Sequence, residues 1–267
     1  MSRLRLLVSD LAGTVIDHGC QAPVGLFQRA FSRVGVTVSA RQVRGPMGKA
    51  KLEHVRALFA IPTVQQHWRD LYKRDPTEDD TFQVYNSLAT DQEELLLAHS
   101  KVISSVVPAF NNLRNLGLKT SACSGYNNAM VNILRVPLSQ QGLRFDHIIA
   151  SDEVAQGRPA PDMIQHLMKL AGVTNPAEVI KIGDTPVDIA EGHSAGTWTV
   201  GVLRSSSELG LSAEDYDSLS FTNKRQALFV AGSKLSVQNP HFLIENMCFL
   251  PEVVRNINQR LERGERP

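Results

Sequence analysis

The chain has 267 residues, with 28 Lys and Arg against 27 Asp and Glu and a formal net charge of +1. This balance provides no electrostatic case for nucleic acid or an anionic membrane as a partner. Hydrophobic residues make up 42% of the chain, without a run long enough for a membrane-spanning helix. A chain of this length can form one sizeable core and a smaller second unit.

The cysteines indicate a reducing compartment. Cys20, Cys123 and Cys248 are odd in number and do not have the spacing of metal ligands. The apolar stretch near the N-terminus is interrupted by Asp10, so it does not have the pattern of a signal peptide. We therefore expect a cytoplasmic protein.

Short apolar runs alternate with helical stretches along much of the chain. The expected strands are residues 4–8, 118–123, 147–150, 179–182 and 198–202. Such alternation is typical of a parallel sheet with crossover helices, so the predicted fold class is α/β. The tail from Leu235 onward has a helical pattern and is expected to pack back on the core or to fray.

The segment from residue 20 to residue 99 differs from the rest because it has almost no strand pattern. Its apolar periodicity predicts helices at 24–34, 52–59, 64–72 and 82–97. A helical insertion after the first strand fits a mobile cap over the carboxyl edge of the sheet. We therefore expect a core domain of residues 1–19 and 100–267 and a cap domain of residues 20–99, with hinges near 19–21 and 100–105.

Asp10 is the first candidate for chemistry, because it directly follows the strand at residues 4–8 on a turn that contains Gly13. A carboxylate at the end of a buried strand is where an α/β sheet presents a nucleophile. Phosphatases with this arrangement usually have a second Asp two residues later, which protonates the leaving group. Here that position is Ala12. The protein is therefore inert, or its leaving group is stabilised in another way.

A lysine downstream offers that other way. Read as one helix, residues 45–58 place Met47, Lys51, His54 and Leu58 on one face, and Lys49 about 160° away from Lys51. A separate apolar stripe, the expected core side, consists of Leu52, Val55 and Phe59. A desolvated lysine has a lowered pKa and can condense with a carbonyl, and the resulting iminium makes carbon a viable leaving group. Taken alone, a Lys-x-x-His pair is more often solvated surface.

Together these two segments resemble one family, the phosphonoacetaldehyde hydrolases (phosphonatases) of the haloacid dehalogenase superfamily. The resemblance rests on Asp-x-Ala-Gly-Thr-x-x-Asp-x-Gly-Cys at 10–20 and Pro-Met-Gly-x-x-Lys-x-x-His at 46–54. It continues through Ser-Gly-Tyr at 124–126, Gly-Arg-Pro at 157–159, Lys-Ile-Gly-Asp-Thr at 181–185 and Asp188, and covers nearly the whole chain. It implies a Rossmann-like α/β core of the haloacid dehalogenase type with a helical cap of the C1 type.

The resemblance also implies roles for individual residues. Asp10 would be the nucleophile and Lys51 the Schiff-base lysine, while His54, together with Met47, would manage proton transfers around Lys51. Residues that would bind substrate or phosphate are Ser124, Gly125, Arg158, Cys20 and Tyr126. Each also has a structural interpretation: Ser124 as a strand-end turn, Arg158 as a surface turn, and a lone Cys or Met as core filler.

Two further acids follow the strand at 179–182. Asp184 and Asp188 could form a helix cap, since Asp is a common capping residue. Converging with Asp10, they would instead form the hard-oxygen site that Mg²⁺ prefers. The resemblance implies Mg²⁺ held by Asp10, the backbone carbonyl of Ala12 and Asp184, with Asp188 in the surrounding shell.

The expected function is therefore hydrolysis of phosphonoacetaldehyde to acetaldehyde and phosphate, a step in 2-aminoethylphosphonate degradation, through an iminium on Lys51 and an aspartyl-phosphate on Asp10. One alternative is a phosphatase or phosphomutase acting on a small phosphate ester, and Ala12 argues against it. The other is a non-catalytic protein that binds phosphorylated or aldehyde metabolites. Resemblance alone also implies a homodimer.

Overall fold

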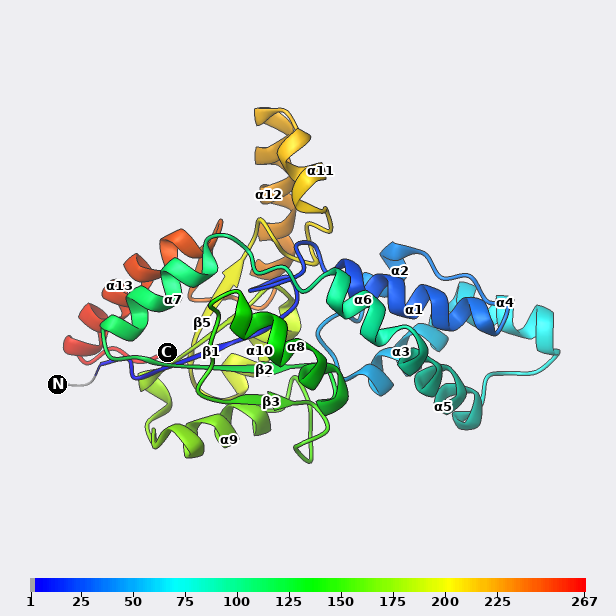
Figure 1. Ribbon diagram of the computed structural model, residues 1–267, viewed down its shortest axis with the longest axis horizontal. Coiled ribbons are helices and arrows are strands. Elements are labelled where there is room, and N and C mark those ends of the chain that lie inside the picture. Colours follow the sequence, from blue (N-terminus) through cyan, green and yellow to red (C-terminus); the bar gives the residue numbers. More distant parts are fainter. Residues whose placement is uncertain (1–2) are drawn as a thin grey trace.

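The structure is a computed structural model and describes residues 3–267. A six-stranded parallel sheet lies at its centre, in the order β3-β2-β1-β4-β5-β6 (Figure 1). The strands are β1 (Leu6–Ser9), β2 (Lys119–Ser124), β3 (Ile148–Ala150), β4 (Val179–Gly183), β5 (Trp198–Val202) and β6 (Phe242–Ile244). The predicted α/β class with a parallel sheet is confirmed.

Helices cover both faces of this sheet. They are α7 (Val106–Asn115), α8 (Asn128–Gln140), α9 (Asp162–Ala171), α10 (Pro186–Ser194) and α13 (Leu250–Glu262). Leu7 of β1 belongs to the core that includes α7, α8 and α13, whereas Leu6 and Val8 belong to the core under α9. Because β1 is buried on both sides, its residues form a continuous apolar run rather than an alternating one.

A group of helices lies beyond the carboxyl edge of the sheet, at the right of Figure 1. It consists of α1 (Gln21–Arg33), α2 (Ala40–Arg44), α3 (Lys51–Phe59), α4 (Pro62–Tyr72), α5 (Glu78–Ser87), the 3₁₀ turn η1 (Leu88–Thr90) and α6 (Gln92–Ala98). Aromatic side chains fill its centre, with Trp68 against Phe59 and Phe59 against Phe31. This is the helical insertion that the sequence predicts.

The two chain segments that join these helices to the sheet run side by side. Ile16 and Val102 form an antiparallel bridge, and the Ile103 N–H donates to the Val15 carbonyl over 2.9 Å. The buried Asp17 carboxylate accepts hydrogen bonds from the N–H groups at the start of α1, those of Gln21 and Ala22. The segment at Asp17 and the segment at Val102 therefore act as one connection.

Three details of the sequence prediction are wrong. Residues 45–50 are not helical: α3 begins at Lys51, because Gly48 has φ +90° and a Cβ there would lie 2.6 Å from Thr185 Oγ1. Met47 and Lys49 are therefore not on the same helix as Lys51. The expected core side of this helix is also wrong in part, because Leu52 is only half-buried whereas His54 is fully buried. The predicted helix at 82–97 is broken by η1 between α5 and α6.

The C-terminal third contains more than the predicted helical tail. It includes α11 (Ala213–Ser218), α12 (Phe221–Ser236), the edge strand β6 and the 3₁₀ turn η3 (Met247–Phe249). Earlier in the chain, the 3₁₀ turn η2 (Pro176–Glu178) precedes β4. α11 and α12 project from the body at the top of Figure 1, and α13 packs beside α7. Within residues 3–267, no helix is long and apolar enough to cross a membrane.

Candidate active site

The site is built at the carboxyl ends of the central strands. Asp10 follows β1, and its N–H donates to the Ile182 carbonyl of β4 over 2.9 Å. The chain then turns at Gly13, which has φ +84°. A Cβ on Gly13 would lie 2.2 Å from Asp184 Oδ2, so only glycine lets this turn approach Asp184. The turn thus brings the Asp10 carboxylate close to the acids that follow β4.

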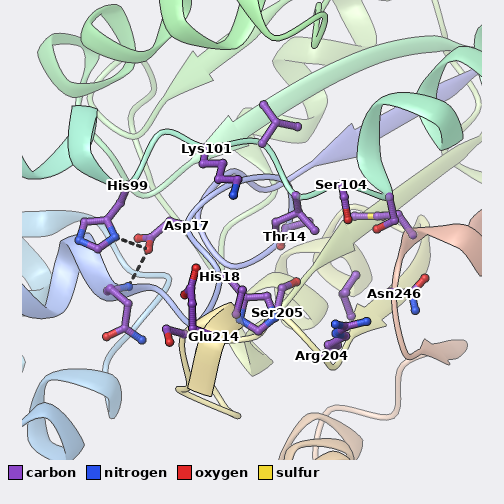
Figure 2. Close-up of a pocket in the computed structure, with 18 of the residues that line it drawn as sticks. Thr14, Asp17, His18, His99, Lys101, Ser104, Arg204, Ser205, Glu214 and Asn246 are labelled. Carbon is purple, nitrogen blue, oxygen red and sulfur yellow. Dashed lines mark hydrogen bonds and ion pairs between the residues drawn. The ribbon is translucent and has the colours of Figure 1, made fainter. Parts of the chain in front are cut away.

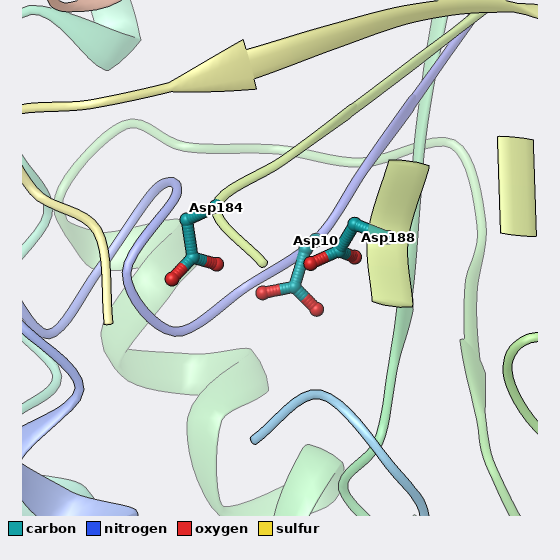
Figure 3. A group of neighbouring side chains, drawn as sticks. All are labelled: Asp10, Asp184 and Asp188. Carbon is teal, nitrogen blue, oxygen red and sulfur yellow. The ribbon is translucent and has the colours of Figure 1, made fainter. Parts of the chain in front are cut away.

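Three carboxylates converge there: Asp10, Asp184 and Asp188 each offer an oxygen, and these oxygens lie within 4.8 Å of one another (Figure 3). All three side chains are buried. Burial raises the pKa of Asp10 to about 6, against the attraction of Arg158. Burial and the neighbouring charges of Asp10 and Asp188 raise the pKa of Asp184 well above its usual value. A cation between these two carboxylates would favour the ionised form of both.

Asp184 is held so that it can receive such a cation. Its Oδ1 accepts a hydrogen bond from the Thr14 hydroxyl at 3.0 Å, and its Oδ2 accepts one from the Ser207 N–H at 2.7 Å. The Cys20 thiol lies 3.6 Å from the same Oδ2. These contacts come from three separate segments, so the position of the carboxylate depends on the tertiary fold. Cys20, expected at the substrate, lies against this acid.

Asp188 is engaged differently, because protein groups already occupy both of its oxygens. Its Oδ2 accepts hydrogen bonds from the hydroxyl and N–H of Thr185, which form a capping box at the start of α10. Its Oδ1 lies 2.9 Å from Arg158 Nη1 and 3.0 Å from Lys181 Nζ. Burial alone would raise the pKa of Asp188, but these two cations lower it below its usual value. Both readings of the motif, helix cap and member of an acidic site, therefore hold for Asp188.

Arg158 faces the nucleophile directly. Its Nη1 donates to Asp10 Oδ1 at 2.8 Å, and its Nη2 donates to the Cys123 carbonyl at 2.7 Å. Its Nε donates to Glu191 Oε2 at 2.8 Å. The guanidinium is buried, and although burial favours its neutral form, the surrounding carboxylates raise its pKa well above the usual value. The arginine is therefore a fixed positive charge beside Asp10, not a surface turn.

Sequence reasoning missed two members of this network, Lys181 and Glu191. Lys181 lies in β4 with no exposed surface, and its Nζ contacts Glu191 Oε2 at 2.9 Å. Glu191 lies on α10, one turn after Asp188, and is also fully buried. A charged residue inside an apolar strand, such as Lys181, was the available indication that a buried charge partner exists.

Lys51 reaches the site from the other side, from the first residue of α3. Its side chain is buried, and burial lowers the pKa of the amine from 10.5 to about 8. Aromatic rings form its surroundings, with Nζ 4.8 Å from the centre of the Tyr126 ring and 5.7 Å from that of Phe27. A lysine in these surroundings has a substantial neutral fraction near neutral pH, and a neutral amine can attack an aldehyde.

His54 lies one turn after Lys51 and has no exposed surface. Its ring stacks on Phe27 at 3.9 Å between centroids, and its Nε2 lies 2.8 Å from the Val43 carbonyl. Because a carbonyl accepts only, we assign the ring proton to Nε2, which leaves Nδ1 as a base without a hydrogen-bond partner in the described residues. Burial and the nearby Lys51 lower the pKa of His54 well below 6.5, so the ring is neutral.

The remaining predicted residues line the same region. Ser124 ends β2, and its hydroxyl accepts a hydrogen bond from the Tyr126 N–H at 3.1 Å. The buried Tyr126 hydroxyl has no partner among the described residues. A Cβ on Gly125 would lie 2.5 Å from the Lys49 carbonyl, so this glycine lets the loop before α3 close over the sheet edge. Met47, in the same loop, is buried.

A large cavity lies elsewhere. It measures about 640 Å³ and lies beside the two connecting segments, with Asp17, His18, His99 and Lys101 in its lining (Figure 2). None of the residues predicted for the site belongs to this lining. The predicted residues instead meet in a closed interior, where Asp10 and Lys51 are each 5% exposed. Asp10 and Lys51 are therefore almost completely shielded from solvent in this arrangement.

Comparisons with known proteins agree with this geometry. The family model of haloacid dehalogenase-like hydrolases matches residues 4–196. The chain is 38% identical to a phosphonoacetaldehyde hydrolase of Syntrophobacter fumaroxidans over 99% of this chain and 95% of that protein. It is 37% identical to a phosphonoacetaldehyde hydrolase of Bordetella pertussis, with 99% of this chain and 96% of that protein covered.

Solved structures give the same result. A phosphonoacetaldehyde hydrolase-like protein from Oleispira antarctica superposes with a TM-score of 0.97 at 31% identity, covering 99% of this chain and 96% of that chain. A β-phosphoglucomutase from Clostridium difficile superposes with a TM-score of 0.68 at 15% identity, covering 97% and 99%. The second likeness concerns the fold alone.

Proposed function

This chain belongs to the phosphonoacetaldehyde hydrolase family of the haloacid dehalogenase-like hydrolases, and we propose that it cleaves the carbon–phosphorus bond of phosphonoacetaldehyde, giving acetaldehyde and phosphate. One observation carries the proposal: a buried lysine of lowered pKa, Lys51, lies in the same closed interior as the carboxylate Asp10. Ala12 stands where an acid would serve an oxygen leaving group. A leaving carbon needs an electron acceptor instead, and an iminium provides it.

In the proposed mechanism, the neutral amine of Lys51 attacks the aldehyde and water leaves, which forms an iminium. Asp10 then attacks phosphorus in line, the carbon–phosphorus bond breaks, and its electron pair passes to the iminium to give an enamine. Protonation of the enamine carbon and hydrolysis of the imine release acetaldehyde and regenerate Lys51. Water hydrolyses the aspartyl-phosphate on Asp10 and releases phosphate.

The proton transfers around Lys51 are assigned to His54. Its Nδ1 has no hydrogen-bond partner within residues 3–267, and because the pKa of the ring is lowered it would take a proton from the condensing amine and readily give it up again. Met47 is a buried thioether without acid–base capacity and would shape the space around the aldehyde. The Tyr126 hydroxyl, which also has no partner among the described residues, would bind the substrate oxygen, while Cys20 would hold Asp184 in position.

The phosphoryl group would be bound on the side of the site opposite Lys51. Arg158 faces Asp10, and the Ser124 hydroxyl with the N–H groups near Gly125 follows the neighbouring strand. Each of these groups would stabilise negative charge on the phosphoryl oxygens. Arg158 also attracts Asp10, which keeps the nucleophile ionised in a buried setting.

The chain also fits a divalent metal, and we assign Mg²⁺. Asp10, Asp184 and the Ala12 carbonyl would hold it, since oxygen donors of this kind suit a hard cation. Burial raises the pKa of both Asp10 and Asp184, and a cation between the two carboxylates would stabilise their ionised forms. When bound, Mg²⁺ neutralises charge on the transferring phosphoryl group. Asp188 would not bind the metal directly but would lie next to its ligands, because Thr185, Arg158 and Lys181 occupy its oxygens.

We further assign residues 20–99 as a mobile cap and residues 1–19 with 100–267 as the core. The closed interior supports motion, because substrate must reach Asp10 and the loop before α3 contacts the sheet edge at Gly125. Residues 19–21 and 100–105 would be the hinges.

The three cysteines are free, which supports a cytoplasmic location. The exposed apolar side chains Phe229 and Val230 on the projecting α12 support a homodimer, which sedimentation analysis would test.

The decisive experiment is incubation of the purified protein with phosphonoacetaldehyde and Mg²⁺, followed by assays of acetaldehyde and phosphate. Equal amounts of both products are expected. Release of phosphate from small phosphate esters, without acetaldehyde from phosphonoacetaldehyde, would favour a phosphatase or phosphomutase. Binding of either compound without turnover would favour a non-catalytic protein.

A further inference from the structure

Glu191 has no role in the mechanism above, although it is fully buried beside it. It lies on α10, which approaches the sheet closely at Gly192: a Cβ there would lie 2.5 Å from Thr199 Cγ2 and 3.1 Å from Lys181 Cβ. This close approach brings the Glu191 carboxylate under the carboxyl edge of β4. A buried carboxylate at such a position is costly unless cations compensate it.

Two cations do so, and both also contact acids of the site. Glu191 Oε2 lies 2.8 Å from Arg158 Nε and 2.9 Å from Lys181 Nζ. Arg158 Nη1 in turn contacts both Asp10 and Asp188, and Lys181 contacts Asp188. The charges form one chain from Glu191 through Arg158 to the nucleophile. In the proposed mechanism Glu191 contacts neither the substrate nor the metal.

The geometry of the guanidinium shows what Glu191 contributes. Each nitrogen of the Arg158 guanidinium has a fixed partner: Nη1 at Asp10 and Asp188, Nη2 at the Cys123 carbonyl and Nε at Glu191. During catalysis Asp10 gives up its position as an acceptor when it attacks phosphorus. Asp188 still contacts Nη1, while Glu191 at Nε and the Cys123 carbonyl at Nη2 hold the other two nitrogens and so the plane of the guanidinium.

We propose that Glu191 is a positioning residue that fixes the Arg158 guanidinium toward the phosphoryl group while Asp10 reacts. The inference rests on the proposed function, because Arg158 acts there on the phosphoryl oxygens. Condensation of Lys51 with the aldehyde occurs on the cap side of the site and does not involve Arg158. Loss of Glu191 therefore slows phosphoryl transfer and leaves iminium formation unchanged.

The test compares these two half-reactions in Glu191→Gln, which keeps the size of the side chain. Phosphate release from phosphonoacetaldehyde is expected to fall roughly 10- to 100-fold, as for a group misplaced by a fraction of an ångström to about 1 Å. Reductive trapping of acetaldehyde on Lys51, followed by mass spectrometry, is expected to keep its rate within about twofold. A purely structural role would lower both rates together, and that result would overturn the proposal.

A matched control is Asp80→Asn in the cap. Asp80 is also a buried carboxylate paired with an arginine, Arg74, far from the Arg158 network in the sequence and fold. This variant loses stability but keeps the ratio of the two half-reactions. Should Glu191→Gln fail to fold, the double variant Glu191→Gln/Lys181→Met removes one buried charge of each sign and is expected to show the same split.

Binding of inorganic phosphate in the presence of Mg²⁺ separates this inference from the proposed substrate. By calorimetry, Glu191→Gln is expected to bind phosphate roughly tenfold more weakly than wild type, and Asp80→Asn equally well. If the wild-type protein binds phosphate but releases no acetaldehyde, the proposed function is wrong. The comparison of phosphate binding between wild type and Glu191→Gln would still test whether Glu191 positions Arg158. Unchanged phosphate binding and turnover in Glu191→Gln would overturn the positioning role.

Discussion

The Nζ atom of Lys51 lies 4.8 Å from the centre of the Tyr126 ring, although one residue begins helix α3 and the other follows strand β2. Burial lowers the pKa of Lys51 to about 8. The lowered pKa therefore depends on the packing of two segments that are far apart in the sequence. This relationship leads to the first two predictions.

Lys51→Arg should abolish turnover. Its guanidinium keeps the positive charge but stays protonated, so it cannot condense with an aldehyde. In the wild-type protein, borohydride added with acetaldehyde should leave a reduced adduct on Lys51, which peptide mass spectrometry would locate. Lys49→Arg is the matched control and should stay active, because Lys49 lies in the loop before α3 and Arg keeps its positive charge. An adduct on Lys49, or an active Lys51→Arg enzyme, would refute the mechanism.

The pH dependence of adduct formation should report the pKa of Lys51. Only the neutral amine attacks, so the trapping rate with cyanoborohydride should rise about tenfold per pH unit below 8 and level off above it. An ordinary lysine of pKa 10.5 would show a rate that still rises steeply between pH 8 and pH 10. Such a continued rise, measured on the Lys51 peptide, would mean that the amine is not desolvated in solution.

Chelation should stop phosphate release, and added Mg²⁺ should restore it. Asp184→Asn should raise the Mg²⁺ concentration needed for half-maximal activity roughly 100-fold or more, and Asp188→Asn roughly tenfold. The difference follows because Asp188 is engaged by Thr185, Arg158 and Lys181, and residues behind a metal ligand affect affinity less than the ligand itself. Calorimetric titration with Mg²⁺ provides a readout without turnover. Equal effects of both substitutions would contradict the assignment.

Asp10→Asn should lower turnover by on the order of 10⁴-fold or more, since an amide cannot attack phosphorus. Phosphate release with matched amounts of folded protein measures this. Activity within tenfold of wild type would remove Asp10 from the nucleophile role.

The same variant should be more stable than wild type in the absence of metal at pH 8. The folded pKa of Asp10 is about 6, above the ordinary 3.8, so the wild-type protein loses stability as the pH rises through 6. Asn resembles the protonated acid and avoids this loss. The melting temperature of Asp10→Asn should therefore exceed that of wild type by a few degrees at pH 8, and the difference should disappear near pH 4. A lower melting temperature at pH 8 would contradict the raised pKa.

The α/β class, the places of five strands and the acids that follow β1 and β4 are predictable from the sequence alone. Strands buried on both faces are rich in apolar residues, so β5 at Trp198–Val202 is recognised without any knowledge of its neighbours. Asp10 and Asp184 are predictable for the same reason, because each comes just after such a strand.

Tertiary contacts decided the rest. β6 has only three residues, partly exposed, and forms because the edge of β5 offers hydrogen-bond partners. The start of α3 depends on Gly48, whose positive φ lets the loop approach Thr185. Lys181 stands inside an apolar strand, which indicates a buried partner but does not identify it, and Glu191 has the sequence pattern of an ordinary charged residue. They become a buried pair beside Arg158 only when α10 packs on the sheet, because charge compensation in a protein interior depends on distances that no local pattern contains.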